Sequence, residues 1–103
     1  MARALIQAGI CGFKTIVEAH LEGEDCVVSI ESECKSIQKL AGDVCRLDPF
    51  REITFRGQGP QILSQAAKRC PHTACPVPSG IIKAVEVASG LALPADASIH
   101  LEK

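Results

Sequence analysis

The chain has no tryptophan and no tyrosine, and its only aromatic residues are three phenylalanines. Proteins that hold single-stranded nucleic acid or quaternary ammonium groups usually do so with stacked aromatic rings, so both kinds of binding are disfavoured. There is no excess of one charge either, because 11 Lys and Arg residues are balanced by 12 Asp and Glu residues. The basic residues are scattered along the chain, and we therefore expect no nucleic-acid partner.

The sequence also lacks a hydrophobic run long enough to span a bilayer. Its N-terminal stretch, MARALIQAGICGF, has one Arg and an apolar run shorter than a transmembrane helix or the hydrophobic part of a signal peptide. We therefore expect no membrane partner and a cytoplasmic protein. No repeat or linker divides the 103 residues, which predicts a single domain over residues 1–103 with an ordinary hydrophobic core.

Common catalytic motifs are missing as well. The chain contains no glycine-rich phosphate loop, no G-x-G-x-x-G dinucleotide motif and no G-x-S-x-G nucleophile elbow. No catalytic residue is therefore assigned, and the sequence favours a binding protein over an enzyme.

The pattern of apolar residues predicts a mixed fold. Two alternating segments, residues 13–21 and 26–31, flank a polar turn and predict a β-hairpin. Apolar spacings of three and four predict helices over residues 32–47, around 62–67 and over 79–89. Alternation over residues 97–101 predicts a returning strand. The expected fold class is α+β, in which a small antiparallel sheet of hairpin plus C-terminal strand has about three helices packed on one face.

Six cysteines are the most informative feature of the composition. In a reducing compartment structural disulfides do not persist, so this number of cysteines indicates metal ligation or thiol chemistry. Cys26 lies on the apolar face of the second predicted strand and Cys45 lies near the end of the first predicted helix. Because free cysteine is often a small buried hydrophobe, we expect both to have packing roles.

The other four cysteines lie where predicted elements begin or end. Cys11 is followed by Gly12 and precedes the first predicted strand, and Cys34 lies in the first turn of a helix, where the helix dipole favours a thiolate. Cys70 and Cys75 are separated by four residues in CPHTACPVPSG, a spacing found in structural zinc sites. His72, between them, is a possible additional ligand.

Strand and helix ends gather at the edges of a sheet, so these four cysteines are suited to converge in three dimensions. We expect Cys11, Cys34, Cys70 and Cys75 to bind a metal ion or cluster, with zinc and an iron–sulfur cluster as the two candidates.

The motifs also resemble those of a known family. They are Ile10-Cys11-Gly12-Phe13 with Thr15, Ser32-x-Cys34, Cys75-Pro76-x-Pro78-x-Gly80 and Gly90-Leu91-Ala92-Leu93-Pro94. Together they span nearly the whole chain and resemble an uncharacterised family of small cysteine-containing proteins of anaerobic bacteria and archaea, a domain of unknown function. A more distant similarity is to TSCPD-type and NifU-like iron–sulfur scaffold domains, which implies that Cys34, Cys70 and Cys75 correspond to ligand cysteines of those domains.

Two other functions stay open at this point. Cys34 could act as the nucleophile of a thiol redox protein, with a second cysteine resolving the intermediate. Alternatively, the cysteines could be structural and the protein an interaction module that binds a protein partner through an apolar surface.

Overall fold

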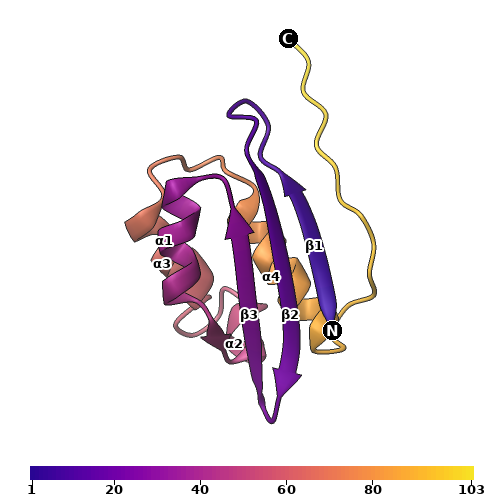
Figure 1. Ribbon diagram of the computed structural model, residues 1–103. Coiled ribbons are helices and arrows are strands. Elements are labelled where there is room, and N and C mark those ends of the chain that lie inside the picture. Colours follow the sequence, from indigo (N-terminus) through magenta and orange to yellow (C-terminus); the bar gives the residue numbers. More distant parts are fainter.

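A computed structural model describes residues 1–103 (Figure 1). Its elements are, in chain order, β1 (Ala2–Gln7), β2 (Lys14–Glu22), β3 (Asp25–Ser32), α1 (Lys35–Asp43), β4 (Arg46–Leu47), α2 (Pro49–Glu52), α3 (Gln61–Arg69) and α4 (Val77–Ala88). The strands form one sheet in the order β1-β2-β3-β4, and all three neighbouring pairs are antiparallel. The α+β class expected from the sequence is therefore confirmed.

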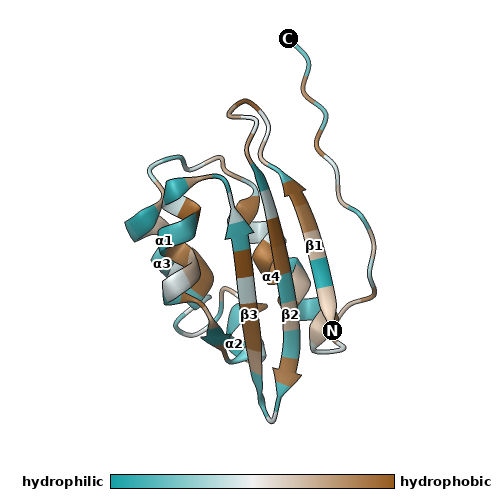
Figure 2. Cartoon of the chain, in the orientation of Figure 1, coloured by the Kyte–Doolittle hydropathy of each residue, from teal (hydrophilic) through white to brown (hydrophobic).

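The sheet buries one face against the helices. Alternation along β2 places Thr15, Val17 and Ala19 on that face, and their partners across β3 are Ser32, Ile30 and Val28. Helix α4 contacts β1 and β2, while α1 contacts β3 (Figure 1). Colouring by hydropathy shows apolar segments alternating with polar ones along the strands (Figure 2). The core is built almost entirely from aliphatic side chains, as the shortage of aromatic residues requires.

One sequence prediction about the sheet is wrong, and one strand was not predicted. Residues 97–101 are not a strand; they lie in an exposed C-terminal tail outside the sheet. The third long strand is instead β1, within an N-terminal stretch that we interpreted only as a short apolar run. Alternation at residues 97–101 was a misleading signal because periodicity shows only that a segment is able to pair as a strand, and here the segment makes no backbone hydrogen bond to the sheet of its own chain.

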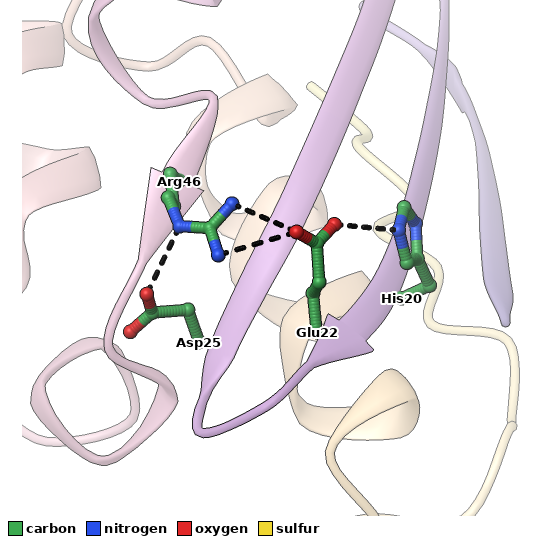
Figure 3. Close-up of polar contacts among 4 residues, drawn as sticks. All are labelled: His20, Glu22, Asp25 and Arg46. Atoms are coloured by element: carbon green, nitrogen blue, oxygen red, sulfur yellow. Dashed lines mark hydrogen bonds and ion pairs between the residues drawn. The ribbon is translucent and has the colours of Figure 1, made fainter.

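The first helix is shorter than its apolar spacing predicted. It ends at Asp43, and the following residues Arg46 and Leu47 form β4, which pairs with the start of β3. Arg46 donates from Nε to Asp25 Oδ2 over 3.0 Å and contacts Glu22, which also lies 3.8 Å from His20 (Figure 3). These exposed ion pairs link β4 to the hairpin tip, and solvent screening makes each of them weak.

None of the helices is long and apolar enough to cross a membrane.

Candidate functional site

Three chain segments meet at the end of the sheet where β1 ends and β2 begins (Figure 1). They are the loop at residues 8–13, the start of α1 and the connection at residues 70–76 between α3 and α4. They enclose a cavity of about 150 Å³. All four cysteines expected to act together line this cavity, and so does His72; the remaining lining residues are Ala8, Phe13, Thr15, Ser36, Ile37, Pro71 and Val77.

Cys34 is held by a hydrogen-bonded turn between β3 and α1. It is the residue that precedes the first helical turn, and its amide donates to Ser32 Oγ over 3.1 Å. Ser32 Oγ is also 2.8 Å from the hydroxyl of the buried Thr15. This relay from β2 through Ser32 fixes the Cys34 backbone, while its thiol makes no capping hydrogen bond and is left available to the cavity.

Thr15 was not recognised from the sequence as part of this site. A strand threonine on a buried face is usually a packing residue, and nothing in the local pattern indicates that its hydroxyl reaches Ser32. Only the register, which pairs Thr15 with Ser32, brings the two together.

Cys70 is positioned by the end of α3. Its amide donates to Ala66 O over 2.8 Å, and the chain then leaves the helix at Pro71. The preceding residue, Arg69, holds Asp43 at the end of α1 through two hydrogen bonds of 2.7 and 3.3 Å. The Arg69 guanidinium beside Asp43 lowers the pKa of that carboxyl. This two-pronged ion pair ties the C-terminal ends of the two helices together immediately before Cys70.

Cys75 lies in a short turn before α4, where its amide donates to His72 O over 3.2 Å. Its side chain is half-buried and packs against the hydrophobic core, as do those of Cys34 and Cys70. The three thiols therefore lie at the boundary between the core and the cavity, on elements that are fixed by packing.

Cys11 differs from these three because it is exposed and sits on the loop between β1 and β2. Gly9 and Gly12 adopt positive φ angles of 96° and 72°, a conformation that favours glycine, and Gly12 N donates to Gly9 O over 2.9 Å. The tight turn places Cys11 in the lining of the cavity.

The electrostatics of Cys70 show how near the thiols are to one another. Burial raises the pKa of the Cys70 thiol, and the negative charges that Cys75 and Cys34 carry when ionised raise it further. Like charges raise each other's pKa only at short range, so Cys70 lies within electrostatic reach of both neighbours. Both effects favour the protonated form of Cys70.

The donor set is four thiols and one imidazole, and no carboxylate lines the cavity. Such a set suits zinc and iron–sulfur clusters and does not suit magnesium or calcium, which prefer oxygen ligands. As the side chains are arranged here, however, no three His, Cys, Asp or Glu groups are placed to hold one ion. Each cysteine has a single side-chain torsion with three staggered positions, so ligation requires rotation of the thiols into the cavity.

The remaining two cysteines lie apart from the cavity. Cys26 is fully buried on β3, as expected for a packing residue, and burial raises the pKa of its thiol. Cys45, which we expected to pack as well, is exposed. The reason is that α1 ends at Asp43, so Cys45 lies beyond the helix in the segment that leads into β4.

A family model covers residues 2–101, nearly the whole chain. The chain belongs to DUF6951, a family of unknown function. No curated protein and no solved structure matches it. The resemblance to an uncharacterised family is therefore confirmed, whereas the distant similarity to TSCPD-type and NifU-like domains stays a prediction.

Proposed function

We propose that this DUF6951 protein binds a metal ion or an iron–sulfur cluster through Cys34, Cys70 and Cys75, with Cys11 as a fourth ligand from the loop above them. The observation that carries the proposal is that these four cysteines, from three separate segments of the chain, line one cavity while Cys26 and Cys45 do not. His72 is the alternative fourth ligand because it lines the same cavity.

The chain's own residues would do two things in this function. The Ser32 turn and the end of α3 hold the backbones of Cys34 and Cys70 beside the cavity, and rotation of the side chains would turn their sulfurs inward. The apolar floor formed by Ile37 and Val77 limits access of water, which strengthens thiolate-to-metal bonding and protects the sulfurs from oxidation. A bound metal would supply the positive charge that lets neighbouring thiols ionise together.

The thiol redox alternative is less well supported. Its nucleophile, Cys34, would need a neighbouring positive charge to stabilise the thiolate. No Lys or Arg side chain lines the cavity.

The test begins with anaerobic purification, elemental analysis and a near-ultraviolet and visible spectrum. The lack of tryptophan and tyrosine leaves a low protein background, so thiolate-to-metal bands will be easy to see. We expect zinc or iron in stoichiometric amount, and replacement by cobalt should give bands whose intensity reports the number of thiolate ligands.

Serine variants assign the ligands. Cys34→Ser, Cys70→Ser and Cys75→Ser should each weaken metal binding by more than about tenfold, the lower limit for disturbing even the outer shell of a metal site. Cys45→Ser is the matched control, because it removes a cysteine that does not line the cavity. If a folded triple variant lacking Cys34, Cys70 and Cys75 retains the metal content of Cys45→Ser, the proposal is wrong.

A further inference from the structure

The C-terminal tail, residues 92–103, makes no backbone hydrogen bond, and its composition is unusual for such a segment. It is almost entirely exposed yet carries three large apolar side chains, Leu93, Ile99 and Leu101, which are 89, 80 and 85 % exposed. Segments that remain disordered are normally poor in such residues, because apolar side chains gain free energy when they leave water. The family match reaches residue 101, so the tail is part of the family's domain.

The sheet has a free edge on the opposite side from β4. Strand β1 pairs only with β2, so one row of its backbone N–H and C=O groups has no partner in the sheet. Ala4 and Ile6 point to the helix-covered face but are only half-buried, and Leu5, on the open face, is 70 % exposed. An unprotected edge of this kind is a template for pairing with another strand.

We propose that residues 97–103 of one molecule add as an antiparallel strand to the β1 edge of a second copy, and that the exchange is reciprocal. One register matches the side chains on both faces. It pairs Leu101 with Ala4 and Ile99 with Ile6 on the helix-covered face, and Glu102 with Arg3 on the open face. His100 and Glu102, already 3.1 Å apart, share that open face in an extended strand.

The direction of α4 favours pairing with a second copy. Gly80, in the first turn of α4, lies against Ile6 near the end of β1, so the helix runs back toward the beginning of β1. The tail consequently starts near the N-terminal end of β1, and Figure 1 shows it leaving the body there. If the tail keeps this direction, pairing within one chain is parallel to β1. With Ile99 beside Ala4, that parallel register places Glu102 beside Gln7, so the Arg3–Glu102 pair forms only in the antiparallel arrangement. The tail also extends beyond the folded body, where it can reach another molecule (Figure 1).

This proposal is independent of metal binding, and it is tested with the full chain in reducing, chelating buffer so that neither disulfides nor metal bridges can link molecules. Light scattering and sedimentation should show a concentration-dependent dimer. Amide exchange should show slowed exchange at residues 98–102 only at concentrations where the dimer forms. A chain that stays monomeric at all concentrations, or a tail that is protected in the monomer, overturns the proposal; the second result would mean pairing within one chain.

Charge reversal tests the register. Arg3→Glu and Glu102→Arg should each weaken the dimer by about tenfold, because an attractive cross-strand pair becomes repulsive at two equivalent places, and the double variant should restore it. Ile99→Lys should abolish the dimer, whereas Leu93→Lys, which changes an equally exposed residue outside the register, should leave it intact. Equal loss in Ile99→Lys and Leu93→Lys, or no rescue in the double charge variant, contradicts the proposed pairing.

Discussion

Glu52 is a buried carboxylate that stabilises a helix other than its own. It is 1 % exposed, and its two oxygens accept from the amides of Gln61 and Ile62 over 2.9 and 2.8 Å. These are the first amides of α3, whose preceding residue, Pro60, has no side-chain acceptor with which to cap the helix. The carboxylate of α2 therefore takes the place of the missing cap.

We expect Glu52→Ala to lower the free energy of unfolding by about 2 to 4 kcal/mol, since two amides lose their acceptor in a buried place. Urea unfolding at neutral pH measures the change. Glu33→Ala is the matched control: Glu33 also accepts from a backbone amide, that of Lys14 over 2.8 Å, but at an exposed site. If both variants lower the free energy of unfolding by the same amount, the burial of Glu52 does not add to its contribution.

Cys26 gives the protein a pH-dependent stability at alkaline pH. Burial raises the pKa of its thiol above the ordinary value of 9.0. The folded state therefore holds its proton at pH values where the unfolded state has lost it. The contribution of Cys26 to the free energy of unfolding is fully present below the ordinary pKa. It falls as the pH rises from the ordinary pKa through the raised pKa, by up to about 1.4 kcal/mol per pH unit.

Unfolding measured between about pH 8 and pH 10 should show this decline, and Cys26→Ala should make it shallower. A smaller decline should remain, because the pKa of Cys70 is raised as well. Cys45→Ala, at an exposed cysteine, should leave the slope unchanged. Equal slopes in the wild-type protein and Cys26→Ala would show that Cys26 is not the group responsible.

At the scale of elements, the contact between α4 and β1 depends on the absence of a side chain at Gly80. A Cβ added there would meet Cδ1 and Cγ1 of Ile6 closer than van der Waals contact allows. We expect Gly80→Ala to cost about 1 to 3 kcal/mol, because Ile6 or the helix must shift, even though alanine is the better helix former. Thermal unfolding is a sufficient measurement.

Gly42 provides the comparison within the same molecule. It also lies in a helix, α1, but nothing would lie within 4 Å of its added Cβ. Gly42→Ala should therefore stabilise the protein by about 0.5 to 1 kcal/mol through helix propensity alone. The two substitutions should change the free energy of unfolding in opposite directions, which separates the effect of close packing from that of helix propensity. If both stabilise the protein, the steric argument at Gly80 is wrong.

The elements that were predicted well are those in which the pattern of apolar residues ends at a residue that favours a turn or a helix end. Strands β2 and β3 alternate strongly on both sides of a glycine turn, and α4 is followed by Gly90, whose φ of 73° suits the end of a helix. The end of α1 was placed too late because Val44 and Leu47 continue the helical spacing although the chain has already left the helix. Their burial comes from tertiary packing and not from helix periodicity.

At the scale of the whole molecule, the gathering of the cysteines follows from topology that local patterns only partly reveal. Cys34 and Cys75 mark helix starts and Cys11 precedes a strand, which was sufficient to expect them at one end of the sheet. The sequence could not give the orientation of the thiols, because that depends on packing of the loop at residues 8–13 against the connection at residues 70–76. It also missed β1, which forms one side of that loop.

Metal binding at this cavity would connect three parts of the fold, namely the β1–β2 loop, the start of α1 and the α3–α4 connection. A ligand that binds only the folded state stabilises it by about 2.7 kcal/mol at a free concentration 100 times its dissociation constant. For a domain of about 100 residues this corresponds to a rise in Tm on the order of 10 °C or more.

We therefore expect a chelator to lower the Tm of the metal-loaded protein and added zinc to restore it. Cys45→Ser should respond as the unmodified chain does, and Cys70→Ser should show a smaller change in Tm. Amide exchange should slow on metal binding at residues 8–13 and 70–76, because both segments become fixed to the same ion. A metal that changes Tm equally in Cys70→Ser and Cys45→Ser would be bound elsewhere on the molecule.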